Sequence, residues 1–231
     1  MKNYVLVGDI HSQYQLLMEA LTYIKNNIEN YYIIFLGDLF DSRVEYSNSL
    51  GVYETVRSLQ NSNLCTIIQS NHQDKYIRYL KGNNVFLNNG LDTTIEDFSN
   101  SSVSKEELLL WLNSFPYGIV FRDKDNLEYR CAHAYFSSKI LVPTDYKDEY
   151  LLKLVSKHTK SKCLYGPVHD NVRIEWWNEE SPHSWIRVAG HYHKVHIDLS
   201  KTKSLVLDAE CGSDNGKLCI YDVNSKLPHY F

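Results

Sequence analysis

The first third of the chain alternates short apolar runs with longer segments whose apolar residues recur at helical spacing. Residues 4–7, 32–36 and 64–69 are short runs rich in β-branched and aromatic residues, a pattern typical of strands buried on both faces. Between the first two runs, apolar residues recur every three or four positions from 17 to 28, which predicts a helix with Ser12 as its N-cap. Strands interleaved with helices in this way indicate an α/β fold.

Four further segments carry helical patterns of differing strength. Residues 46–60 predict a second helix, and residues 74–80 predict a short one that begins just after Asn71 and His72. Ser104 and Glu107 form a capping-box pattern before the apolar LLLWL sequence, so a helix is expected near 105–114. The last predicted helix spans residues 145–157.

The second half of the chain is dominated by short apolar runs separated by Gly, Asp and Asn. This pattern predicts antiparallel strands, the first two joined by the turn-like DKDN sequence, at 118–122, 127–134, 186–190, 196–199, 204–209 and 216–223. Residues 166–184 contain two prolines and two adjacent tryptophans, which indicates a long irregular loop. Loops of that length in compact domains are usually functional.

Composition narrows the class of protein. At 231 residues and 43% hydrophobic content, residues 1–231 can form one sizeable domain, and neither a linker nor a repeat interrupts them. The 28 acidic and 24 basic residues give a net charge of −4 without a long run of one sign, so no general affinity for nucleic acid or membrane is expected. Five cysteines lie singly in apolar stretches, as reduced core residues do. With no signal peptide or membrane-length apolar run, we expect a soluble, cytoplasmic protein.

Polar residues follow the predicted strands at the points where the strands end. Asp9 and His11 follow the first strand, Asp38 follows the second, and Asn71-His72 follow the third. In open α/β sheets the edge beyond the carboxyl ends of the strands is where ligands bind. The second half contributes histidines at comparable positions, namely His133, His191 and His193.

If these side chains converge, they form a group rich in metal-binding atoms. Two carboxylates, an amide oxygen and several imidazoles at a half-buried site would leave charge unpaired without cations, which is costly. Mixed oxygen and nitrogen ligands suit Mn²⁺ best, with Fe, Zn²⁺ or Mg²⁺ as alternatives, and a central Asp38 could bridge two divalent ions roughly 3.5–4 Å apart. Each residue alone has a simpler explanation, a turn or helix cap for an Asp and a satisfied core or surface group for a His.

Five short motifs follow one another in a fixed order over positions 8–193. They read GDIH, GDLFD, SNH, AHA and GHYH. This series resembles the calcineurin-like metallophosphoesterase superfamily. The segments SNHQDKYIRYLKG and SLVLDAECGSDNGKLCIYDV are also similar to its phosphoprotein phosphatase branch, whose bacterial and phage relatives include diadenosine polyphosphate hydrolases. The resemblance covers nearly the whole chain and implies a central β-sandwich of mixed sheets flanked by α-helices.

The resemblance also implies a role for each site residue. Asp9, His11 and Asp38 would bind the first metal ion, and Asp38, Asn71, His133 and His191 the second. His72 would be the general acid, oriented by Asp41, and Arg43 would neutralise the phosphate. His193 stands where phosphoprotein phosphatases commonly have threonine, and in other superfamily members this second histidine completes the shell of the first metal. The implied reaction is attack of a metal-activated hydroxide on a phosphomonoester.

Three departures from the branch bear on the substrate. The first departure is that Arg43 follows Asp41-Ser42, which places the arginine one residue later than in the usual Asp-Arg-Gly sequence. The alternative to a catalytic role for Asp41 and Arg43 is a surface ion pair, which would contribute little to stability. Ser70 and Gln73 replace the Gly and Glu that flank Asn-His. His193 is the third departure.

Several substrates fit the resemblance. Phosphoserine and phosphothreonine proteins rank first, and dinucleoside polyphosphates or RNA ends with a 3′-phosphate or 2′,3′-cyclic phosphate are the alternatives. Arg173, Trp176 and Trp177 in the 166–184 loop either clamp a phosphate and stack a base, or cap the sheet with core tryptophans, which we favour. A binding module that has lost catalysis is an alternative of another class, but none of the six main metal-binding residues is missing.

Overall fold

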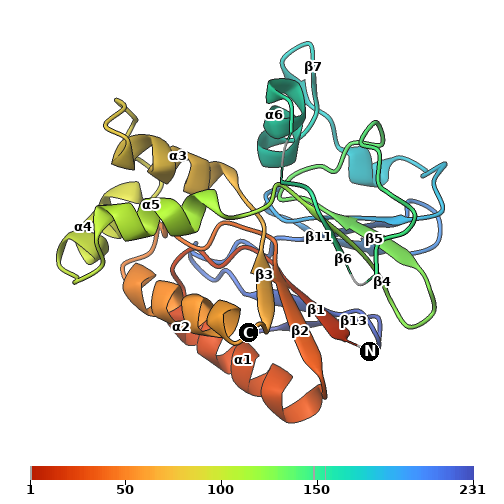
Figure 1. Ribbon diagram of the computed structural model, residues 1–231, viewed down its shortest axis with the longest axis horizontal. Coiled ribbons are helices and arrows are strands. Elements are labelled where there is room, and N and C mark those ends of the chain that lie inside the picture. The colour runs from red at the N-terminus through yellow and green to blue at the C-terminus, as the bar shows by residue number, and fades with distance from the viewer. Residues whose placement is uncertain (1, 148, 154) are drawn as a thin grey trace.

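Two β-sheets pack face to face in the computed structural model, which describes residues 2–147, 149–153 and 155–231 (Figure 1). One sheet has the strand order β13-β12-β1-β2-β3 and the other β10-β11-β9-β5-β4-β6. Between them lies a buried apolar cluster that includes Leu6 and Ile34 from the first sheet and Phe121 and Leu205 from the second. The predicted β-sandwich of mixed sheets flanked by helices is confirmed.

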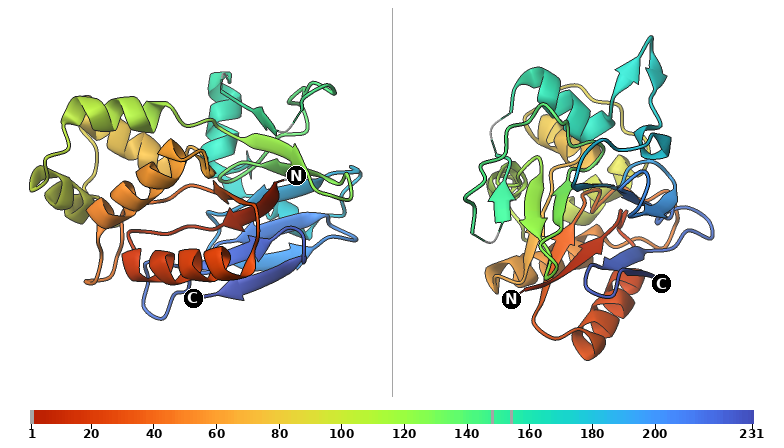
Figure 2. Two further views of the ribbon diagram at one scale, coloured as in Figure 1. Left: turned by 60° about the horizontal axis from the view of Figure 1, so that its bottom comes forward. Right: turned by 90° about the vertical axis from the view of Figure 1, so that its right-hand side faces the viewer.

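The first sheet contains the three strands predicted near the N-terminus. Its strands are β1 (Asn3–Val7), β2 (Tyr31–Phe35), β3 (Cys65–Ile67), β12 (Cys219–Asp222) and β13 (Leu227–Tyr230). The first three are parallel to one another, so their carboxyl ends lie at the same edge. Helices α1 (Tyr14–Asn27) and α2 (Ser49–Asn61) cover the outer face of this sheet, where a second apolar cluster is buried (Figure 2).

The starts of three helices differ from the prediction. Ser12 is not a cap; it has a left-handed backbone with φ of +59°, and its hydroxyl bonds the Ser49 hydroxyl at 3.0 Å. Helix α2 begins later than predicted because the Asn48 side chain accepts a bond from the Gly51 N–H. Helix α3 (Asn71–Leu80) begins earlier because Ser70 caps it, which places Asn71 in its first turn.

Helices α3, α4 (Leu91–Ser99) and α5 (Lys105–Asn113) gather at one side of the molecule (Figure 1). The predicted cap of α5 is confirmed, because the Ser104 hydroxyl accepts a bond from the Glu107 N–H at 3.1 Å. The sequence analysis did not predict α4. It follows Gly90, whose φ is +86° and whose missing Cβ would lie 2.0 Å from the Ser42 carbonyl oxygen, so only glycine fits there.

The second sheet is mixed, whereas antiparallel strands were predicted. Its strands are β4 (Ile119–Arg122), β5 (Glu128–Cys131), β6 (Glu149–Leu151), β9 (Ile186–Ala189), β10 (Val195–Asp198) and β11 (Ser204–Leu207). The β4–β5 pair is antiparallel as predicted, but β9 pairs in parallel with both β5 and β11. Alternating apolar residues identify a strand without identifying its partner, and that explains the error.

The predicted helix over residues 145–157 is wrong. Within that range Glu149–Leu151 forms β6, which pairs antiparallel with β4, while residues 148 and 154 lie outside the described residues. The edge of β4 offers backbone hydrogen-bonding groups to residues 149–151, and the sequence pattern of these residues does not indicate that pairing. Helix α6 (Lys157–Tyr165) starts where the predicted helix was to end, capped by the Ser156 hydroxyl.

The segment 166–184 is largely irregular, as predicted. It contains a small hairpin, β7 (Val168–His169) with β8 (Val172–Arg173), and a single 3₁₀ turn at Trp176–Asn178. Trp176 and Trp177 are buried beside Tyr192, and the Trp176 indole donates a hydrogen bond to the Tyr192 hydroxyl. The interpretation of these tryptophans as core residues is therefore confirmed.

Two expectations from composition can be compared with the structure. All five cysteines are free and buried, as expected for packing residues. Within the part of the chain that the structure describes, no helix is both long enough and apolar enough to cross a membrane.

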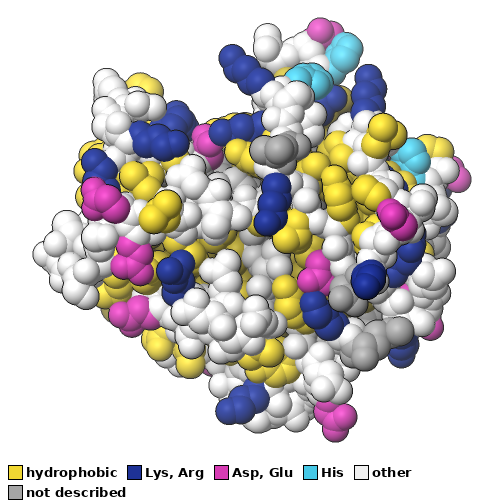
Figure 3. All heavy atoms as spheres, viewed as in Figure 1, with side chains coloured by type: hydrophobic (Ala, Val, Ile, Leu, Met, Phe, Trp, Pro, Cys, Tyr) yellow, Lys and Arg dark blue, Asp and Glu magenta, His cyan; other side chains and the backbone are white. Residues whose placement is uncertain are grey.

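Positive charge collects in a groove between α3 and α6 (Figure 3). Arg78, Lys81, Lys153 and Lys160 line this groove, and Asp74 pairs with both Arg78 and Lys160. The groove is thus locally basic in a chain whose net charge is −4.

Candidate active site

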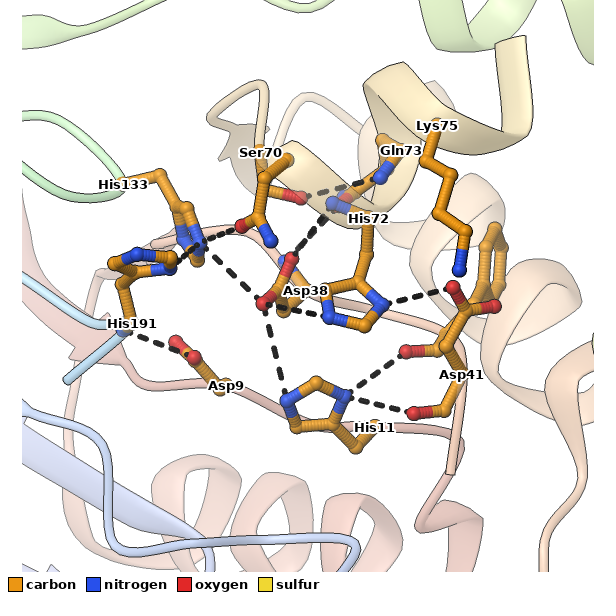
Figure 4. Close-up of polar contacts among 12 residues, drawn as sticks. Asp9, His11, Asp38, Asp41, Ser70, His72, Gln73, Lys75, His133 and His191 are labelled. Carbon is orange, nitrogen blue, oxygen red and sulfur yellow. Dashed lines mark hydrogen bonds and ion pairs between the residues drawn. The ribbon is translucent and has the colours of Figure 1, made fainter. Parts of the chain in front are cut away.

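The carboxyl ends of β1, β2 and β3 bring the predicted side chains to one place. Asp9, Asp38 and the first turn of α3 meet histidines that follow β5 and β9 of the second sheet (Figure 4). They surround a cavity of about 200 Å³, while His133 lies fully buried behind its wall. All seven predicted metal-binding residues lie at this cavity or directly behind its wall.

Asp38 is the centre of the cluster. Its Oδ2 lies 3.3 Å from His133 Nε2, 3.8 Å from His11 Nε2 and 3.9 Å from His72 Nε2. Burial by itself raises the pKa of the Asp38 carboxyl, but the charges of His133 and His72 outweigh it and hold the pKa well below its usual range. The carboxylate is therefore ionised and close to three imidazoles.

The backbone at the site adopts conformations that non-glycine residues rarely take. His11, Asp38, Asp41 and His191 have φ values of +47°, +42°, +69° and +71°. Each such residue costs of the order of 1–3 kcal/mol and persists only where surrounding contacts enforce it. Residues in this conformation also occur in surface turns, but active sites often hold several of them together, as this cavity does.

Two histidines are held so that one ring nitrogen faces the cavity. The Nδ1–H of His133 donates to the Leu36 carbonyl at 2.9 Å, and that of His11 donates to the Phe40 and Asp41 carbonyls at 3.1 and 3.0 Å. A backbone acceptor on Nδ1 fixes the tautomer and leaves the Nε2 lone pair free to bind a metal.

Several nitrogen and oxygen atoms that can bind a metal lie close together at this cluster. His133 Nε2 lies 2.7 Å from the Asn71 side-chain oxygen and 3.2 Å from His191 Nδ1. Asp9 Oδ1 and His191 Nε2 are buried without a hydrogen-bond partner among the described residues. Burial, with the neighbouring His133, lowers the pKa of His191 to about 2, so this imidazole is neutral. A divalent cation would bind the imidazole nitrogens and the Asn71 and Asp9 oxygens, so the residues present fit the predicted metal ions.

His72 and Asp41 form a pair beside this cluster. His72 Nδ1 lies 2.8 Å from Asp41 Oδ2, and the other Asp41 oxygen accepts a bond from the Thr94 hydroxyl at 2.7 Å. Burial by itself lowers the pKa of His72, but the Asp38 charge and the Asp41 hydrogen bond outweigh it and raise the pKa above its ordinary value. His72 is thus held in one orientation and favoured in its protonated form, as a general acid requires.

Three longer side chains reach the cavity from its rim. Arg43, Arg173 and His193 line it, and the Arg173 guanidinium also lies over the Tyr192 ring, 5.5 Å from its centre. The His193 side chain is 53% exposed, in contrast to the buried His191. Its assignment as a metal ligand stays a prediction.

Asp208 is a site residue that the sequence analysis missed. It follows β11 directly, just as Asp9 and Asp38 follow their strands, and this position is the signal that could have found it. Its two carboxylate oxygens accept bonds from the His193 N–H at 2.6 Å and the Glu210 N–H at 2.9 Å. Asp208 also lies close enough to Asp9 that, together with burial, it raises the pKa of the Asp9 carboxyl.

Replacing Asp208 by Asn tests whether this buried carboxylate supports metal binding. The amide cannot accept both backbone bonds, and it removes a negative charge beside Asp9, so we expect metal affinity to fall by roughly 10- to 100-fold. Titration of the metal-free protein with Mn²⁺ measures the change. Asp123→Asn is the matched control, because Asp123 is a buried carboxylate that accepts two backbone bonds in the β4–β5 turn. Equal losses in the two variants would contradict a role specific to the site.

Comparison with known proteins identifies the family. Residues 2–221 match the calcineurin-like phosphoesterase family. The chain belongs to this family. The superfamily predicted from the five motifs is therefore confirmed, and the chain is a phosphate ester hydrolase.

Curated relatives within the family carry a common name. The bis(5′-nucleosyl)-tetraphosphatase PrpE of Oceanobacillus iheyensis, described as asymmetrical, is 27% identical over 221 residues, which cover 84% of this chain and 82% of the relative. The enzyme of the same name from Bacillus subtilis is 29% identical over 209 residues, covering 81% and 78%.

Solved structures of low sequence identity share the fold. The crystal structure of a candidate diadenosine tetraphosphatase has a TM-score of 0.64 at 16% identity and covers 99% of this chain and 92% of its own. A serine/threonine phosphatase from Saccharomyces cerevisiae has a TM-score of 0.57 at 11% identity, covering 99% and 79%. At such identities the comparison supports the fold alone.

The structure accounts for two departures from the motifs of the family branch. Ser70 replaces a glycine and caps α3. Gln73 replaces a glutamate, and its side-chain oxygen accepts a hydrogen bond from the Asp38 N–H at 3.0 Å. Gln73 thus supports the position of the central carboxylate, and Ser70 fixes the start of the helix that carries Gln73.

Proposed function

We propose that the chain hydrolyses dinucleoside polyphosphates, cutting a dinucleoside tetraphosphate into a nucleoside triphosphate and a nucleoside monophosphate. The observation that carries the proposal is that five curated relatives share the name of an asymmetrical bis(5′-nucleosyl)-tetraphosphatase. Phosphoproteins ranked first on sequence alone, but the phosphatase of that class is 11% identical and supports only the fold. The nucleotide alternative therefore takes first place.

The charge at the rim supports a substrate with several phosphates. Arg43 and Arg173 reach the cavity from different segments, in addition to the cluster around Asp38. A guanidinium binds phosphate oxygens through paired hydrogen bonds, and a phosphate chain extends beyond the reacting phosphorus, so two arginines can neutralise neighbouring phosphates.

The reaction needs a nucleophile, charge neutralisation and a proton donor. Two divalent ions would be held by the residues of the cluster, namely Asp9, His11, Asp38, Asn71, His133 and His191, with His193 at the rim. When bound, such ions supply Lewis acidity to the phosphate oxygens and lower the pKa of water. Water attacks one phosphorus, and the bond from that phosphorus to the bridging oxygen breaks. His72 donates a proton from Nε2 to the departing oxygen while Asp41 holds Nδ1.

Product analysis tests the proposal. Diadenosine tetraphosphate incubated with the protein and Mn²⁺ should give equal amounts of ATP and AMP, resolved by anion-exchange chromatography. Two molecules of ADP would contradict asymmetrical cleavage. An enzyme that hydrolyses p-nitrophenyl phosphate and a phosphopeptide but leaves diadenosine tetraphosphate intact would overturn the substrate assignment and restore the phosphoprotein alternative.

A further inference from the structure

A buried hydroxyl group lies directly behind the His72–Asp41 pair. It belongs to Thr94, in the first turn of α4, which is fully buried and does not line the catalytic cavity. Its Oγ1 donates a hydrogen bond to Asp41 Oδ1 at 2.7 Å and accepts one from the Asp41 backbone N–H at 3.1 Å. The other Asp41 carboxylate oxygen lies 2.8 Å from His72 Nδ1 (Figure 4). One hydroxyl group therefore holds both the backbone and the carboxylate of the residue that orients His72.

The Thr94 hydroxyl has a second acceptor within reach. It lies 3.2 Å from the Gly90 carbonyl oxygen, four residues earlier, and threonines in helices commonly form this bond. The single hydroxyl hydrogen goes to Asp41, because that bond is shorter and its acceptor is a carboxylate. Thr94 thus serves the catalytic pair in preference to its own helix.

Two serines extend the hydroxyl contacts away from the site. The Ser49 hydroxyl donates to Thr94 Oγ1 at 3.4 Å, and the Ser12 and Ser49 hydroxyls lie 3.0 Å apart. Both serines are buried. Because Thr94 donates to Asp41 and Ser49 donates to Thr94, Ser12 is the donor to Ser49. All three hydroxyl dipoles then point toward the Asp41 carboxylate, which strengthens the bond that holds it.

The backbone of Asp41 needs support of this kind. Its φ is +69°, a conformation that a non-glycine residue keeps only where its surroundings enforce it. The bond from the Asp41 N–H to Thr94 is one such contact. Helix α4, which carries Thr94, is itself fixed against this loop, because Gly90 packs directly on the Ser42 carbonyl. The position of α4 therefore determines the position of Asp41.

We propose that Thr94 is a positioning residue for the general acid and acts through Asp41 on His72. The inference rests on the proposed function, because it requires that His72 protonates the departing oxygen. A general acid must hold its proton close to that oxygen and aligned with it, and small errors in position lower the rate. Thr94 fixes the rotation of the Asp41 carboxylate, and the carboxylate fixes the ring of His72.

The dependence of the rate on the leaving group tests the inference, because weaker proton donation changes it and a loss of stability does not. Phenolate leaves less readily than p-nitrophenolate, so phenyl phosphate depends more on the general acid than p-nitrophenyl phosphate does. Thr94→Val removes the hydroxyl and keeps the shape of the side chain. At saturating Mn²⁺ we expect kcat on phenyl phosphate to fall by about 10-fold or more, and kcat on p-nitrophenyl phosphate to fall far less.

Three further variants control for structural damage. Thr94→Ser keeps the hydroxyl and should retain most of the activity on both esters. Thr94→Ala is the second variant without the hydroxyl, and circular dichroism shows whether each protein is folded. Thr202→Val is the matched control and should change neither rate, because Thr202 is a buried threonine at the far end of β11 from Asp208 and bonds the Ser204 hydroxyl at 2.7 Å.

A double-mutant cycle with His72→Ala separates the inference from the proposed function. If Thr94 acts through His72, Thr94→Val should cause no further loss on phenyl phosphate in the His72→Ala protein. An unchanged ratio of the two rates in folded Thr94→Val, or the same loss with and without His72, would overturn the role of Thr94 alone. A His72→Ala protein that loses both activities equally would overturn the general acid as well. Cleavage of diadenosine tetraphosphate, measured separately, tests the substrate in either case.

Discussion

The His72→Ala variant should lose activity on phosphate esters with poor leaving groups by about 10²–10⁴-fold. His72 would donate the proton to the departing oxygen, and an alkoxide such as that of serine leaves poorly without one. The loss on p-nitrophenyl phosphate should be far smaller, because p-nitrophenolate is a stable anion. Steady-state kinetics on a phosphoserine peptide and on p-nitrophenyl phosphate measure both effects. Phosphate leaving groups of a dinucleoside tetraphosphate need less protonation, so an intermediate loss is expected there.

Asn71→Ala provides the matched comparison, because Asn71 and His72 are neighbours with different predicted roles. The Asn71 side-chain oxygen faces His133 Nε2, whereas His72 bonds Asp41. Asn71→Ala should weaken metal binding and lower the rate on both substrates together, while His72→Ala should leave the metal content nearly unchanged. A His72→Ala protein that loses its metals, or loses both activities in equal proportion, would show that the role assigned to this histidine is wrong.

Asp38→Asn should reduce activity by about 10³-fold or more. The Asp38 carboxylate lies within 4 Å of the imidazoles of His133, His11 and His72, and it is the predicted bridge between two ions. An amide is neutral and binds divalent ions more weakly, and the ions contribute several kcal/mol to the transition state. Turnover of p-nitrophenyl phosphate at saturating Mn²⁺ measures the loss.

Cys131→Ala is the control for Asp38→Asn. Cys131 is also fully buried, but it lies in the apolar cluster between the sheets. Its replacement should cost some stability and little activity. Circular dichroism establishes whether both variants are folded, and equal loss of activity in two folded variants would count against the assignment of Asp38.

The site was predictable from the sequence where strand ends and motif order coincide. Asp9 and Asp38 follow parallel strands, so the sheet itself brings them to one edge. Asp208 occupies the same kind of position after β11 but was missed, because it belongs to none of the five motifs and β11 was not expected to pair in parallel with β9. Motif order predicted the residues that the structure brings together around Asp38, and only the tertiary structure revealed Asp208 beside them.

Fold prediction failed where distant parts of the chain decide local structure. The helical pattern over 145–157 gave way to a strand at Glu149–Leu151 because the edge of β4 was available to pair with it. Ser12 has the residue type of an N-cap, yet its hydroxyl bonds Ser49 of another helix. In contrast, the cap at Ser104 depends on a bond to the N–H three residues along the chain, and the sequence pattern predicted it.

Metal content and its relation to activity test the central claim most directly, namely that the cluster around Asp38 is a two-metal centre. Inductively coupled plasma mass spectrometry on purified protein should find about two divalent ions per chain. Chelation should abolish hydrolysis of p-nitrophenyl phosphate, and added Mn²⁺ should restore it in proportion to the ions bound. Full activity in a chelator-treated preparation shown to be free of metal would contradict the account.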